Sequence, residues 1–120
     1  MLRADISLLL NTLPKEFILD VKGFRLGFSH ICQKVHTKYF SYLIAKGTDL
    51  NIGIGVITGK KKVNRAVQRN ACRRLNKEMF RQHKHLFEHT ILIVLTNNNA
   101  ACATKEELWH SINEFLTKYV

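Results

Sequence analysis

Hydrophobic side chains recur along the chain with spacings that predict an alternation of helices and strands. Residues 1–13 mix apolar and polar positions as a short helix would, and residues 24–35 carry apolar side chains at helical spacing. Residues 39–45 and 52–58 are rich in aromatic or β-branched side chains, which predicts two strands. Residues 91–95 form the clearest strand of the chain. The pattern therefore predicts a protein that mixes helices with a sheet.

Turn and cap signals set the limits of these elements. Leu13-Pro14 ends the first helix, because proline disfavours helical geometry in the residue before it. A turn cluster at 46–49 closes one strand. Thr104 and Glu107 form a capping box that starts a final helix near the end of the chain. The 120 residues contain no repeat, linker or low-complexity tail, so we expect one domain over 1–120.

Positive charge is concentrated in one segment of the chain. The formal net charge is +10, and residues 60–84 contain ten Lys and Arg side chains against a single acid, Glu78. The rest of the chain is close to neutral, so one basic element is attached to an otherwise balanced domain. A patch of this kind is typical of proteins that bind a polyanion.

A helix predicted over 64–83 places these charges along one side. Five cations at steps of four residues form what we call the cationic ridge: Arg65, Arg69, Arg73, Lys77 and Arg81. The apolar positions of the other side are Val67, Ala71, Cys72, Leu75 and Met79. Like charges at this spacing destabilise a helix by roughly 0.2–0.5 kcal/mol per pair, which indicates an absent anionic partner. The ridge spans about 24 Å, enough for several phosphates. Lys60, Lys61 and Lys62 extend it at the N-terminal end.

Three other interpretations of the basic helix are weaker. A purely solvated face is disfavoured because guanidinium groups pair bidentately with phosphate oxygens. A membrane-surface helix is disfavoured because the apolar side is small and has no Trp. A DNA-reading helix is disfavoured because the ridge has few Asn or Gln and no paired turn-helix. The chain also has no apolar run long enough to span a bilayer and no signal peptide, so we expect a cytoplasmic protein.

Candidate chemical sites elsewhere in the sequence are few. Three histidines follow the basic helix: His83, His85 and His89. They lack a further donor nearby, so we expect surface histidines rather than a zinc site. The cysteines are odd in number and never at CxxC spacing, which predicts reduced, packed thiols: Cys32, Cys72 and Cys102. No triad, carboxylate pair or phosphate loop is present, so we predict no catalytic residue and no metal held by the protein.

The aromatic side chains allow two interpretations. Four of them could pack in the core or stack on unpaired bases: Phe24, Phe28, Tyr39 and Tyr42. Trp109, in the final helix, is expected in the core.

The basic stretch from Lys60 to Arg81 resembles the signature of the bacterial ribonuclease P protein subunit. In that family a Lys-Lys pair leads into a helix that reads roughly Arg-Asn-Arg-x-Lys-Arg-x-x-Arg-Glu-x-Phe-Arg. Supporting matches cover most of the chain: Leu13-Pro14-Lys15-Glu16, Phe24, Phe28, Ile54-Gly55-Val56, residues 91–95 and Glu107-Leu108-Trp109. The chain departs from the family pattern at five positions: Ile18, Gly53, Ala71, Thr90 and Asn97. These departures predict weaker and more salt-sensitive RNA binding.

The resemblance implies a fold. It implies the α+β class, with a single-domain α/β sandwich similar to the second domain of ribosomal protein S5. The implied element order is αβββαβα. The basic helix would lie in a left-handed βαβ crossover, against the usual handedness of such connections.

The resemblance also implies a function, as the protein subunit of an endoribonuclease that trims 5′ leaders from precursor tRNA. Catalysis would belong to an RNA component with its own Mg²⁺, and the partners would be that RNA and precursor tRNA, with no DNA and no membrane. The implied RNA-binding residues are Lys60, Lys61, Lys62, Arg65, Arg69, Asn70, Arg73, Arg74, Lys77 and Arg81. A cleft between the sheet and the first helix would take the leader, with Phe24, Phe28 and Tyr42 as candidates. The alternative is a non-catalytic, ribosome-associated RNA-binding protein of the same fold.

Overall fold

Seven regular helices and strands make up the part of the chain that the structure, a computed structural model, describes: residues 17–47, 50, 52–59 and 63–119. They are α2 (Val21–Ser29), β1 (Ile31–His36), β2 (Phe40–Lys46), β3 (Gly53–Ile57), α3 (Ala66–Gln82), β4 (Thr90–Thr96) and α4 (Lys105–Tyr119). Two short 3-10 helices, η2 (Lys84–Leu86) and η3 (Asn98–Cys102), precede β4 and α4. This succession confirms the order αβββαβα. The helix predicted over 1–13 lies outside the described residues.

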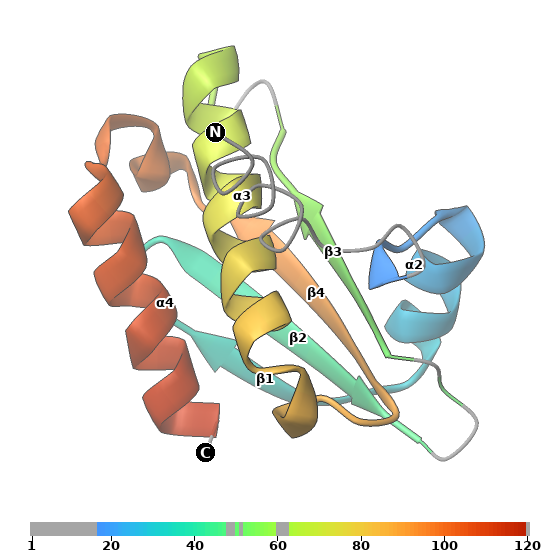
Figure 1. The fold of residues 1–120 in the computed structure, drawn as a ribbon. Helices are drawn as coiled ribbons and strands as arrows, with labels where there is room; N and C mark the ends of the chain where they lie inside the picture. Colours follow the sequence, from blue (N-terminus) through green and yellow to red (C-terminus); the bar gives the residue numbers. More distant parts are fainter. Residues whose placement is uncertain (1–16, 48–49, 51, 60–62, 120) are drawn as a thin grey trace, which may run out of the picture.

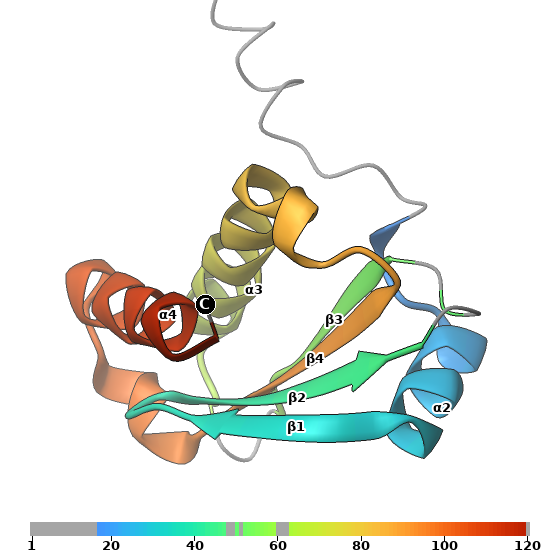
Figure 2. The same cartoon turned by 90° about the horizontal axis from the view of Figure 1, so that it is seen from below.

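The four strands form one mixed sheet between two helical layers. Their order is β1-β2-β4-β3, with β1, β2 and β4 antiparallel and β3 parallel to β4. Helices α3 and α4 lie side by side on one face, and α2 lies on the other (Figures 1 and 2). The chain passes from β3 through α3 to β4 in the left-handed sense (Figure 1). Such crossovers are nearly always right-handed, so the implied departure from the rule is confirmed.

Each face of the sheet has its own hydrophobic core, because successive side chains of a strand point to opposite faces. In β2, Tyr42 and Ile44 join the core under α3 and α4, whereas Leu43 and Ala45 join the core under α2. The Tyr42 ring is stacked on Phe115 of α4, with centroids 3.9 Å apart. A strand buried on both faces reads as a nearly continuous apolar run, which is why the sequence predicts β2 and β4 well.

The helix predicted over 24–35 is wrong in its second half. Asp20 caps α2 by accepting the Gly23 N–H at 2.8 Å, and the helix ends at Ser29. The following residues form β1, paired antiparallel with β2. A register shift between Ile31 and Gln33 interrupts the alternation of β1, so its apolar residues do not follow the period of a strand. This bulge explains why the sequence pattern favours a helix there.

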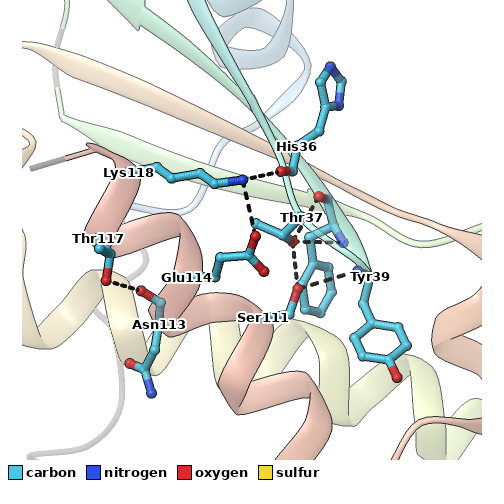
Figure 3. A network of polar contacts seen from close by, with 9 residues as sticks. His36, Thr37, Tyr39, Ser111, Asn113, Glu114, Thr117 and Lys118 are labelled. Atoms are coloured by element: carbon cyan, nitrogen blue, oxygen red, sulfur yellow. Dashed lines mark hydrogen bonds and ion pairs between the residues drawn. The ribbon is translucent and has the colours of Figure 1, made fainter.

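Helix α4 begins where the sequence predicts and is fixed to the turn between β1 and β2. The Thr104 N–H donates to the Glu107 carboxylate at 2.9 Å, and the Glu107 N–H donates to the Thr104 hydroxyl at 3.2 Å, which confirms the capping box. Further along, Ser111 exchanges a hydrogen bond with the Thr37 hydroxyl (Figure 3). The Lys118 ammonium donates to the His36 carbonyl at 3.2 Å. The orientation of α4 on the sheet is therefore set by polar contacts as well as by packing.

Candidate nucleic-acid interface

Helix α3 presents a narrow buried face to the sheet and leaves the rest to solvent or a partner. Its buried residues are Cys72, Asn76, Met79 and Phe80. Val67, predicted on the apolar side, is 76% exposed, so that part of the prediction is wrong. At 100° per residue Val67 lies about 140° around the helix from Cys72, too far to reach the core. The buried face is polar at one position, where the Asn76 side-chain oxygen accepts a hydrogen bond from the Tyr42 hydroxyl at 2.8 Å.

The cationic ridge exists, and its members differ in accessibility. Arg65, at the N-cap, is exposed, and Arg74 beside the ridge is exposed too. The other ridge residues are half-buried: Arg69, Arg73, Lys77 and Arg81. Each step of four residues rotates by about 40°, so the ridge winds gradually away from the buried face. Lys60, Lys61 and Lys62 lie outside the described residues.

Several of these cations already have partners within the protein. Arg73 Nη1 donates to the Asn70 side-chain oxygen at 3.1 Å, so the two implied RNA-binding residues are oriented together. Arg81 Nε lies 2.6 Å from the Glu78 carboxylate, which neutralises the C-terminal end of the ridge. The free positive charge of the ridge is therefore concentrated in the N-terminal half of α3.

The N-terminal end of α3 has an uncompensated positive field. Arg65 makes no side-chain cap bond, and the first turn contains no acid. The first-turn amides and the positive end of the helix dipole thus attract an anion in addition to the arginines.

Burial lowers the pKa of the Lys77 ammonium, and the nearby Arg73 guanidinium lowers it further. The cations on this helix repel one another, and a bound phosphate would relieve that repulsion.

The three aromatic leader candidates occupy different environments. Phe28 of α2 is 47% exposed. Phe24 is half-buried and lies on the bare backbone of Gly55, where an added Cβ would come within 2.2 Å of the ring. Tyr42 is fully buried on the opposite face of the sheet, under α3 and α4. Tyr42 is therefore a core residue and is wrong as a leader candidate, because no base can reach its ring.

The other aromatic alternatives are also decided by burial. Tyr39 is 6% exposed and belongs to the core under α4, with its hydroxyl 3.2 Å from the Glu107 carboxylate. Trp109 is half-buried and packs against the same core, as predicted.

The α2 face of the sheet, the side that carries Phe28, has an open row of side chains that sequence reasoning missed. The strand pairings place four residues side by side across the sheet: His36, Ser41, Leu95 and Ile57. Helix α2 covers the neighbouring rows, where Gly27 sits against Ile91 and Ile93. The open row is less protected: His36 is exposed, Ile57 is 40% exposed, and the other two are half-buried. Only the strand register reveals this row, and no sequence motif marks it.

The remaining candidate residues form no chemical centre in the described part of the chain. No three His, Cys, Asp or Glu side chains gather there as a metal site would require. His85 and His89 are exposed as predicted, and His83 is half-buried. The cysteines are free, but Cys32 and Cys102 are exposed, so the prediction of packed thiols holds for Cys72 alone. No described helix is both long enough and apolar enough to cross a bilayer.

Known proteins share both the sequence pattern and the fold. Residues 15–120 match the family described as Ribonuclease P. The ribonuclease P protein component of Acinetobacter baylyi is 30% identical over 93 residues, which cover 72% of this chain and 71% of that protein. The corresponding protein of Citrifermentans bemidjiense is 41% identical over 64 residues, about half of each chain.

Two solved structures of the same description superpose on this fold. The RNase P protein of Staphylococcus aureus gives a TM-score of 0.73 at 20% identity and covers 85% of this chain and 94% of that one. The RNase P protein of Thermotoga maritima gives a TM-score of 0.65 at 19% identity, covering 83% of this chain and 94% of that one. These relatives do not favour the alternative of a ribosome-associated protein. The chain therefore belongs to the ribonuclease P protein family, as the resemblance of residues 60–81 implies.

Proposed function

We propose that this protein subunit binds two RNAs on opposite faces of its sheet. The N-terminal half of α3 faces the catalytic RNA of ribonuclease P. The open row and Phe28 take the unpaired 5′ leader of precursor tRNA. Bound in this way, the protein assists endonucleolytic removal of the leader, while the RNA component performs the reaction with its own Mg²⁺.

The contact with the catalytic RNA rests on one observation above all. Arg65 is the N-cap of a helix that has neither a side-chain cap nor an acid in its first turn, and Arg73 and Arg74 lie about two turns further along the same helix. Guanidinium groups and free amides both donate hydrogen bonds to phosphate oxygens, and contacts to phosphates carry no information about base sequence. This surface therefore suits a large structured RNA better than a short specific sequence.

The leader contact rests on the open row. Leu95 and Ile57 provide partly exposed apolar surface, Phe28 adds an exposed aromatic ring, and His36 with Ser41 adds a polar end. The His36 Nδ1 and the Ser41 hydroxyl lie 3.0 Å apart. Aromatic and apolar surface accepts unpaired bases with little sequence preference, because every base has a π-face. A single strand fits such a strip, whereas a duplex hides its base faces.

The side chains of the α3 surface support the assignment of chemistry to the RNA. The charged and amide side chains of this surface are Arg, Lys, Asn and Gln, and its acid, Glu78, is engaged by Arg81. Arginine stays protonated at physiological pH and cannot exchange protons with a reacting group. These residues can hold phosphates and screen their charge, but they cannot activate a water.

The leader contact is tested with two precursor tRNAs, one with a leader of several nucleotides and one with a single nucleotide. With the assembled RNA–protein enzyme, Phe28→Ala should weaken binding of the long-leader precursor by about 1–3 kcal/mol, the value of one stacked base. Binding of the short-leader precursor should not change. Leu26→Ala, on the same helix with 41% exposure, is the matched control. An equal loss for both precursors, or the same loss in Leu26→Ala, would contradict the leader assignment.

A further inference from the structure

Two neighbouring side chains in the first turn of α3 bind main-chain carbonyls on two different segments. Gln68 Nε2 donates to the carbonyls of Ala100 and Ala103, at 2.7 and 2.8 Å. These carbonyls lie in η3 and in the step that leads into α4. Because both partners are acceptors, the orientation of the Gln68 amide is fixed by its surroundings. The first turn of α3 is thereby tied to the segment before α4.

Arg69 ties the same turn to the segment that enters the helix. Its Nη1 donates to the carbonyls of Val63 and Asn64, at 3.0 Å each. Val63 is itself fixed, since its side chain is fully buried and its N–H donates to the Gly59 carbonyl at 3.0 Å. The Arg69 main-chain N–H donates to the Arg65 carbonyl, which begins the regular hydrogen bonding of the helix. One nitrogen of the Arg69 guanidinium is therefore already hydrogen-bonded to the protein's own backbone.

We propose that Gln68 and Arg69 are positioning residues, which hold the first turn of α3 so that its amides and Arg65 meet the phosphates together. This inference rests on the proposed RNA contact of α3 and deepens it. It separates Arg69 from Arg73 and Arg74, whose role is direct charge. Preorganised groups bind better because less freedom is lost on association. Gln68, which carries no charge, thereby becomes important for binding a polyanion.

Charge-conserving variants distinguish positioning from charge. Gln68→Met keeps the length of the side chain and removes the donor. Arg69→Lys keeps the charge, but a single ammonium on a flexible stem does not reproduce the planar fork. The measurement is the dependence of log K on log salt for binding of the ribonuclease P RNA, because its slope counts phosphate contacts at roughly 0.7–0.9 each. Circular dichroism melting of each variant is recorded in parallel.

We expect the slope to flatten by at least one contact in both variants, although neither changes the net charge. Arg73→Gln, which removes one expected contact, calibrates the change. Gln82→Met and Arg25→Lys are matched controls at exposed positions away from the first turn, and their slopes should equal that of the wild-type protein. A melting temperature that falls while the slope stays unchanged would overturn the proposal, since the hydrogen bonds of Gln68 and Arg69 would then contribute to stability alone. An unchanged slope in Arg69→Lys with a flattened slope in Arg69→Gln would also overturn it. Absence of salt-dependent RNA binding in the wild-type protein would instead refute the proposed function.

Discussion

Tyr42 and Asn76 show how one buried polar pair fixes the helix that carries the charges. The Tyr42 hydroxyl donates to the Asn76 side-chain oxygen at 2.8 Å, and the Asn76 amide donates to the Cys72 carbonyl at 2.9 Å. Burial raises the pKa of the Tyr42 phenol well above its ordinary value, and Cys72 raises it further. The phenol is therefore a neutral donor throughout the physiological range, and it links β2 directly to α3.

Tyr42→Phe should destabilise the protein by about 1–3 kcal/mol, because it leaves the Asn76 oxygen buried without its donor. The variant keeps the ring, so packing on Phe115 is retained. Urea unfolding measures the change. Tyr39→Phe is the control, since the Tyr39 hydroxyl contacts the exposed Glu107 carboxylate and its loss should cost less. Equal destabilisation of the two variants would show that the buried Tyr42–Asn76 hydrogen bond contributes no more to stability than the exposed one.

At the residue scale the sequence indicates chemistry better than it indicates burial. The arginines of α3 could be predicted because charge at steps of four residues is readable in the sequence. The burial of Tyr42 under α3 and α4 could not be predicted. Alternation along β2 shows that the neighbours of Tyr42 face the other side of the sheet, but it does not show which helix covers which side. Val67 was misplaced for a related reason: a stripe of apolar residues on a helix does not show where the sheet lies beneath it.

Among the elements, the long ones with strong local signals were predicted to within a few residues. Helix α3, strands β2 and β4, and the start of α4 all have such signals. Strand β1 does not, because its bulge breaks the alternation of its side chains. The open row follows from the register of four strands, which depends on contacts distant in sequence. Local sequence patterns therefore predict the helices and strands, whereas the proposed leader surface can be recognised only once the strands are assembled into a sheet.

Helix α4 offers a test of an element through its cap. The Thr104 N–H lowers the pKa of the Glu107 carboxyl, and the Tyr39 hydroxyl lowers it further. A lowered folded-state pKa means that the ionised carboxylate stabilises the fold above the ordinary pKa of glutamate. This stabilisation is lost as the pH falls through the lowered value. Glu107→Gln should therefore be less stable than the wild-type protein at neutral pH, with a gap that closes on acidification. A gap that is constant with pH would show that ionisation of Glu107 does not contribute.

In the whole molecule, the sheet separates two surfaces of different chemistry. The α3 face carries arginines and free amides, and the α2 face carries partly exposed apolar and aromatic side chains. The left-handed crossover places the basic helix on the face that α4 covers, whereas a right-handed crossover between the same two strands would have placed it on the α2 face (Figure 2). A domain with charge on one face and a strip for unpaired bases on the other can lie between two RNAs.

The role proposed for the whole protein is to let two polyanions meet by screening their repulsion. Alone, it should not cleave precursor tRNA. Combined with a bacterial ribonuclease P RNA, it should restore accurate 5′ cleavage at moderate magnesium. Its benefit should be largest at low magnesium and shrink as magnesium rises, because the metal ions then screen the same charges.

The most direct measurement is the rate of precursor cleavage by that RNA, with and without this protein, across a magnesium series. The RNA must first be shown to be active with its own protein. We predict a ratio of the two rates that is high at low magnesium and approaches one at high magnesium. A protein that binds both RNAs yet leaves the rate unchanged at every magnesium concentration would contradict the claim.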